Sequence, residues 1–213
     1  MTSFPMGRLR ALWALALLAV MAACAPVAPT RYYTLAPVPP APETAARAKP
    51  LVIGVGPIDM ADYLDRPQLV TRSTAMELQL HDFDLWVEAL ETIFPRTVAE
   101  NLSALLGTDR VPLMPAGREV RLDYQVEIDV LRFDAMRPGD VMLDAVWRIY
   151  GRDGTDLLRD GRSRITVPVD EPADGGGTAL GPAVEMPPVV AAMSEATLRL
   201  SREIATAIAA ARN

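Results

Sequence analysis

The chain has 213 residues, half of them apolar, with 27 acidic residues against 21 lysines and arginines. This acidic balance, without any basic tract, argues against nucleic acid as a partner and against electrostatic attachment to anionic lipid. One cysteine and one histidine cannot supply a disulfide or the usual ligand set of a zinc site.

The N-terminal segment predicts a secretory signal peptide over residues 1–23. Arg8 and Arg10 precede an apolar run of about 13 residues. As a helix this run is roughly 20 Å long, too short to span a hydrocarbon core of about 30 Å. It ends in MAAC, which resembles the lipobox of bacterial lipoprotein precursors, in which the cysteine is lipidated and becomes the new N-terminus. Cys24 is therefore the predicted lipidation site, and an ordinary signal peptide with a chance cysteine is the alternative.

Residues 24–50 predict a tether, because seven prolines stand among alanines there and favour extended polyproline. One aromatic island, RYYTL at 31–35, has the character of a short strand, and we expect it to dock on the domain that follows. The free tether is then residues 25–30, roughly 20 Å at most. Such a tether would hold the domain close to the membrane.

The domain itself is predicted over residues 51–213 and begins with strands. The apolar run at 51–58 is typical of a buried strand, and its two glycines suggest a bulge or a close backbone approach. Residues 68–71 and 76–80 are further strand candidates. From Phe83 apolar residues recur every three or four positions, which predicts a helix that is kinked at Pro95 and ends near Gly107.

A meander and a second helix complete the predicted domain. Residues 119–133 alternate apolar and polar side chains, with a break at Val130-Leu131 that suggests a bulge. Strands at 141–150 and 162–169 follow, and a loop rich in glycine and proline precedes a C-terminal helix from about Pro188. The fold class is therefore α+β, an antiparallel sheet with two main helices packed on one face.

No set of residues points to catalysis, a cofactor or a metal. His81 has no nucleophile elbow or oxyanion loop with it. Asp123, Glu127 and Asp129 share one solvated strand face, without the apolar pocket that a catalytic carboxyl pair needs. The sequence therefore indicates a binding or scaffolding domain rather than an enzyme.

Several motifs in succession resemble one family. The run IGVGPIDMADYLDRPQLVTR at 53–72 is preceded by RYYTL and followed by DLWVEALETIF at 84–94 and VAENLSALLGTDRV at 98–111. Together with the lipobox they resemble the PqiC family, auxiliary lipoproteins of ABC-type transport systems whose other parts include MCE-domain proteins. The similarity runs from Tyr32 to about Val111 and weakens over the C-terminal half.

This resemblance implies a non-enzymatic subunit, anchored through acyl chains such as palmitate in the outer membrane and facing the periplasm. Ala25 directly after the lipidated cysteine is similar to lipoproteins sorted to that membrane. The subunit would dock an MCE-domain protein that moves phospholipid or other hydrophobic molecules between the membranes. A ring-like homo-oligomer is also implied.

Two further hypotheses concern sites. The turn after the first buried strand is a candidate partner contact, and its alternative is that Asp65 and Arg66 pair internally while Tyr63 caps the core. The turn residues are Tyr63, Leu64, Asp65, Arg66, Pro67 and Gln68. The competing function is a lipid-binding carrier with a pocket between sheet and helices, lined by Trp86, Phe94, Trp147 and Met193. A scaffold for another envelope machine is a third interpretation.

Overall fold

The computed structural model describes residues 29–39, 51–117, 120–136, 139–152, 154–169 and 186–212. From Arg31 onward these belong to one compact unit. Cys24, the predicted signal peptide and most of the predicted glycine-rich loop lie outside the described residues.

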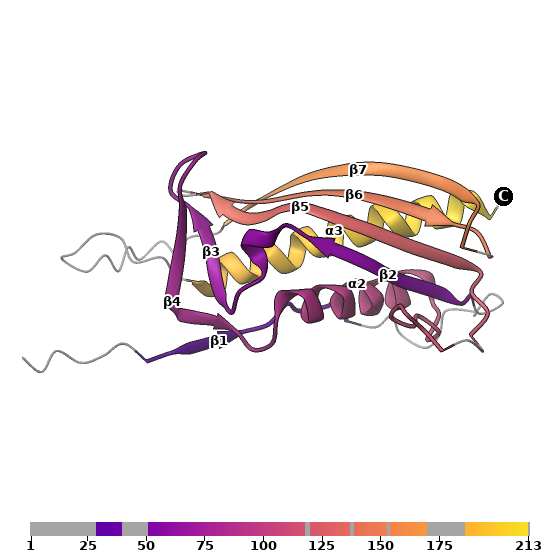
Figure 1. The fold of residues 1–213 in the computed structure, drawn as a ribbon, viewed down its shortest axis with the longest axis horizontal. Coiled ribbons are helices and arrows are strands. Elements are labelled where there is room, and N and C mark those ends of the chain that lie inside the picture. The colour runs from indigo at the N-terminus through magenta and orange to yellow at the C-terminus, as the bar shows by residue number, and fades with distance from the viewer. Residues whose placement is uncertain are drawn as a thin grey trace, which may run out of the picture. The chain divides into compact units, whose positions relative to one another are not determined.

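A mixed seven-stranded sheet carries two helices on one face (Figure 1). Its strands follow the order β1-β4-β3-β5-β6-β7, and β2 also pairs with β5. Helix α2 packs beneath β2, α3 packs beneath β5, β6 and β7, and the two helices contact each other. The predicted α+β class is confirmed. The elements are β1 (Arg31–Tyr33), β2 (Ile53–Met60), η1 (Asp62–Leu64), β3 (Gln68–Arg72), β4 (Leu78–Trp86), α2 (Leu90–Leu106), β5 (Tyr124–Met136), β6 (Asp140–Tyr150), β7 (Leu157–Pro168) and α3 (Met186–Ala211).

The sheet is mixed rather than wholly antiparallel, which corrects one detail of the prediction. Strands β5, β6 and β7 form the expected antiparallel meander. However, β1 pairs parallel with β4, and both β2 and β3 pair parallel with β5. The connection from β2 to β5 contains α2, and a helical crossover brings neighbouring strands together in parallel.

The irregularities predicted in two strands are present. The pairing of β5 with β6 shifts register between Val130 and Arg132. In β2 the register shifts between Val55 and Ile58. A Cβ added to Gly54 would lie 2.7 Å from Cδ1 of Leu122, so the Leu122 side chain packs closely on the backbone here and would have to move for a larger residue.

The first helix begins later than the periodicity predicts. Trp86 was expected on the helix, but it ends β4, where its backbone N–H donates to the carbonyl oxygen of Pro67 at 2.7 Å. Pairing of β4 with strands on both sides thus overrides a helical spacing that continues into α2. The predicted end is correct, because Gly107 adopts a left-handed conformation with φ of 63° and caps α2.

One continuous core fills the space between the sheet and the helices. Phe94 of α2 meets Phe133 of β5 edge to face, with ring centroids 5.6 Å apart. Leu200, Ile204 and Ile208 of α3 are fully buried against the meander. Strand β5 therefore packs against both helices on one face, and it positions the candidate site.

Candidate functional site

The candidate turn bridges two strands that share one edge of β5. Strand β2 pairs with β5 as far as Val130, and β3 joins it only at Ala135 and Met136. Between these pairings η1 lies beside β5, and the Ala61 N–H donates to the carbonyl oxygen of Val130 at 3.0 Å. The turn is therefore built into the sheet and is more than a surface connector.

Tyr63 takes the place of a strand partner at this gap. Its hydroxyl accepts the backbone N–H of Phe133 at 3.0 Å and donates to Oδ2 of Asp134 at 2.7 Å. Burial raises the pKa of Tyr63 to about 12; the Phe133 N–H opposes the rise, and the Asp134 carboxylate adds to it. The hydroxyl therefore stays protonated and satisfies a backbone group that would otherwise be unpaired.

The turn is held to β5 by the buried carboxylate of Asp134. Asp134 is fully buried, and its two oxygens accept from Nε of Arg72 at 2.9 Å and from Nη2 of Arg132 at 2.8 Å. The Arg72 guanidinium also lies 5.4 Å from the centroid of the Tyr63 ring. Burial alone would lower the pKa of Arg72, but its hydrogen bond to Asp134 and the charge of that carboxylate raise it. The buried charge is thus paired and hydrogen-bonded, as its burial requires.

The sequence did not identify this anchor. Arg132 and Asp134 alternate with apolar residues of β5, a pattern typical of a solvated strand face. Only the return of the chain through η1 and β3 covers that face with Tyr63 and Arg72. No local signal distinguishes such a covered carboxylate from an exposed one.

The six predicted contact residues divide into inward and outward groups. Leu64 is 4% exposed and joins the core together with the Tyr63 ring. Arg66 donates through Nε to the carbonyl oxygen of Tyr63 at 2.6 Å, and Gln68 begins β3 opposite Leu85. The exposed members are Asp65 and Pro67.

These positions can be compared with the alternative in which Asp65 pairs with Arg66 and Tyr63 caps the core. Tyr63 does pack against the core, as that alternative supposed. The guanidinium of Arg66 bonds a backbone carbonyl, and the ion pairs found among the described residues do not include Asp65 with Arg66. The turn therefore presents one exposed carboxylate and one exposed proline on a braced support.

The described residues offer little for chemistry. They contain no group of three or more side chains suited to a metal ion. Asp123, Asp129 and Asp144 pair with arginines, and the hydrogen bond from Arg162 holds the pKa of Asp144 below its usual range. His81 lies 2.8 Å from the Thr71 hydroxyl through Nε2. Within the described part of the chain, no helix is long and apolar enough to cross a membrane.

The residues proposed to line a lipid pocket lie in the core. Trp86, Phe94, Trp147 and Met193 are each at most 8% exposed and belong to one packed cluster. The Trp147 indole lies over Gly161, where an added Cβ would come within 2.4 Å of Cζ2. A hollow of about 500 Å³ lies elsewhere, between residues 37–39 and the outer side of α2. These four side chains therefore act as packing residues.

Comparison with known proteins gives a family and a fold. The model of the family described as "ABC-type transport auxiliary lipoprotein component" matches residues 33–205. No curated protein matches the sequence. A solved structure of an uncharacterized protein is similar with a TM-score of 0.66 at 17% identity, over 85% of this chain and 99% of the other. Protein XCC0632 from Xanthomonas campestris, described as DUF330, is similar with a TM-score of 0.60 at 16% identity, over 83% and 93%.

Proposed function

Because the chain belongs to the family of ABC-type transport auxiliary lipoproteins, we propose that it is the outer-membrane-anchored, periplasmic subunit of an intermembrane lipid transporter. In this role it docks an MCE-domain protein and acts by contact, without catalysis. Copies of the chain assemble around that partner as a homo-oligomer. The cargo would be phospholipid or another hydrophobic molecule.

The proposed anchor is a set of acyl chains on Cys24. Each buried methylene contributes about 0.8 kcal/mol, so one chain holds weakly and several hold almost permanently. Seven peptide units separate Cys24 from Arg31, where β1 begins. At about 3.3–3.6 Å per residue they reach at most about 25 Å. The domain is thereby kept near the membrane surface.

The observation that carries the docking proposal is the braced turn. Tyr63, Arg66 and Asp134 fix its backbone, while Asp65 and Pro67 are exposed. A contact surface that is already ordered loses little conformational entropy when a partner binds. Exposed charge at such a surface sets the specificity and the association rate of docking.

Charge reversal at the turn tests this proposal. We expect Asp65→Lys, in the lipidated full-length chain, to weaken capture of the purified MCE-domain partner by about fivefold, since one favourable charge contact becomes repulsive. Asp160→Lys is the matched control, because Asp160 is an exposed aspartate on β7 at the far edge of the sheet. Arg66 is unsuitable, since its side chain supports the turn. Equal capture by both variants would assign the turn a purely structural role.

A further inference from the structure

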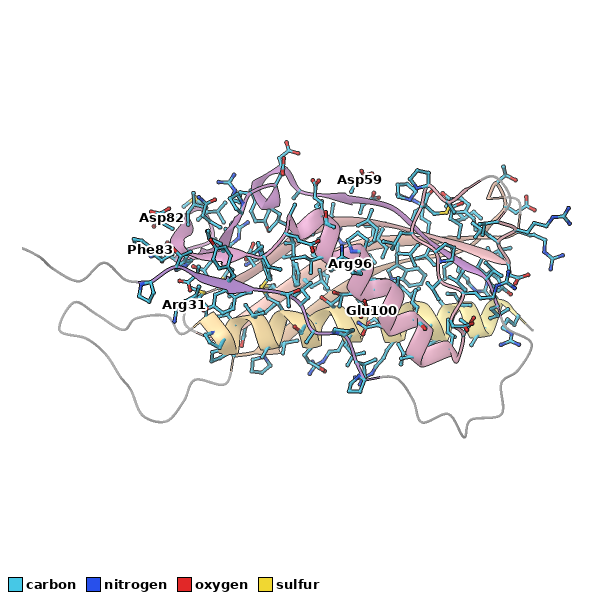
Figure 2. All side chains as sticks on the ribbon, turned by 90° about the horizontal axis from the view of Figure 1, so that it is seen from below. Arg31, Asp59, Asp82, Phe83, Arg96 and Glu100 are labelled. Carbon is cyan, nitrogen blue, oxygen red and sulfur yellow. The ribbon has the colours of Figure 1, made fainter. Side chains whose placement is uncertain are left out.

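Exposed apolar side chains gather at the end of the sheet where β1 begins. Of the twelve large apolar side chains exposed in the described part of the chain, six lie on β1, β4 or directly beside β4. Figure 2 shows Arg31, Asp82 and Phe83 together at this end. We call the six the β4 surface: Tyr32, Met76, Leu78, Leu80, Phe83 and Val87.

Strand register explains why these side chains are exposed together. Leu78 and Leu80 lie two residues apart and therefore share one face of β4. The pairing of β4 with β3 then shifts register, since Gln68 lies opposite Leu85 but Leu69 lies opposite His81. This irregularity leaves Phe83 45% exposed, and Met76 in the hairpin turn is 96% exposed. The exposed apolar side chains therefore extend from the turn between β3 and β4 to strand β1.

The chain's own N-terminal strand covers only part of β4. The carbonyl oxygen of Tyr33 accepts the N–H of Val87 at 2.8 Å, so in this parallel pairing the backbone groups of residues 31 and 33 face β4. Position 29 is a proline, which has no N–H to donate. Strand β1 accordingly begins at Arg31 and pairs only with residues 84–86. The pairing with β1 therefore covers only the last third of β4, whereas β3 pairs with it over 78–81 and at Leu85.

The length of the tether limits what can lie against this surface. Cys24 is at most about 25 Å from Arg31, and Arg31 lies directly opposite Asp84 in the sheet, one residue from Phe83. Any bilayer that holds the acyl chains is therefore within reach of the β4 surface. Exposed Leu157 on β7 belongs to the opposite edge of the sheet.

We propose that the β4 surface rests on the lipid bilayer, with Phe83, Leu80 and Met76 inserted at the level of the headgroups. The proposal rests on the Cys24 anchor of the proposed function and adds a second, non-covalent attachment that fixes the orientation of the domain. Exposed apolar patches rimmed by polar residues mark such surfaces. Glu77 and Asp82 lie within this one and are exposed, so attraction comes from apolar burial rather than from anionic lipid.

A single labelled position can report this contact in the intact protein. Cys24 is the only cysteine, and under the proposed function its thiol carries an acyl chain, so Phe83→Cys supplies one free thiol for a polarity-sensitive fluorophore. The matched control is Leu131→Cys, because Leu131 of β5 is 47% exposed against 45% for Phe83. Both lipidated full-length variants are reconstituted into vesicles of phosphatidylethanolamine and phosphatidylglycerol, with and without brominated lipid.

Brominated lipid should quench the label at position 83 severalfold more than the label at position 131, with little change when salt is raised. Met76→Cys, in the exposed hairpin turn, provides a second position should the first variant fold poorly. Equal quenching at positions 83, 76 and 131 in protein that floats with the vesicles would overturn the membrane contact alone. If mass spectrometry finds no acyl chains on the protein and the protein does not float with the vesicles, the proposed Cys24 anchor is wrong instead. Shielding of position 83 by added partner or by a second copy, without quenching, would assign the surface to protein and overturn the proposal.

Discussion

The meander β5–β7 and the end of the sheet formed by β1, β3 and β4 are held together in different ways. In the meander, β5 pairs with β6 from Gln125 opposite Tyr150 to Met136 opposite Asp140. At the other end β1 has three residues and β3 has five, and each takes part in a parallel pairing. That end meets β5 through a two-residue pairing of β3, and through Arg72 and Tyr63, which bond the buried carboxylate of Asp134.

The difference shows where stability is concentrated. In the meander it is spread over many backbone bonds, buried alternate residues and solvated ion pairs, each of modest effect. At the β4 end, two partly buried arginines share one fully buried carboxylate. Substitutions of one chemical kind should therefore have unequal effects in the two regions.

The largest effect is expected at the buried carboxylate. Asp134→Asn leaves Arg72 and Arg132 without a charge partner, and breaking such a buried pair lowers the free energy of unfolding by about 3–5 kcal/mol. Denaturant unfolding measures this loss. Asp144→Asn is the matched change in the meander, where the partners Arg162 and Arg164 are solvated, and it should have a much smaller effect. Similar losses in both variants would contradict the contrast between the regions.

A smaller effect is expected where the meander is packed most tightly. Gly161→Ala places a methyl group 2.4 Å from the Trp147 ring, and overpacking of this kind destabilises by about 1–3 kcal/mol. Gly151→Ala is the control, since its methyl group would meet Leu158 at an ordinary 3.6 Å. Thermal unfolding of the two variants separates them, and no difference would show that the indole moves aside freely.

The smallest effect is expected from a single hydroxyl. Tyr63→Phe removes the acceptor of the Phe133 N–H and a donor to Asp134, which lowers the free energy of unfolding by about 1–2 kcal/mol. In the folded protein the pKa of Tyr63 is raised from 10.0 to about 12, so its stabilisation is complete below pH 10 and is lost as the pH rises to 12. The substitution should flatten this decline.

Tyr33 must be included in that measurement. Burial, with a hydrogen bond to Asp84, raises the pKa of Tyr33 to about 12 as well. Tyr63→Phe alone should therefore remove only part of the alkaline decline, and Tyr63→Phe combined with Tyr33→Phe should remove most of it. An unchanged slope in the double variant would mean that other groups cause the decline.

Prediction from sequence succeeded where structure is local. Alternation in β5 and β6 reports burial on one sheet face, and Val130-Leu131 breaks that alternation at the observed bulge. The family was also identified correctly from its motifs. The predicted antiparallel direction was wrong for β1 and β2, because strand direction depends on how the chain returns to the sheet, which periodicity does not record. Trp86 keeps helical spacing with Leu90, yet strand pairing decides its conformation.

The candidate site was predicted only as a segment. The turn at 63–68 has the composition of a specific feature, but its brace comes from Arg72 and Asp134, outside the segment. Residues that form one hydrogen-bonded cluster show no periodicity in the sequence when they come from two separate strands and a turn. The expected role of Asp65 remains a prediction for the binding experiment.

Strands β2 and β3 occupy successive stretches of one edge of β5, and this has a consequence for how the family can diversify. The residues between them form no strand that pairs with β5, and of the six turn residues only Asp65 and Pro67 are exposed. Under the proposed docking role, changes at these two positions would alter partner preference while Leu64 and the bond from Phe133 to Tyr63 keep the turn in place.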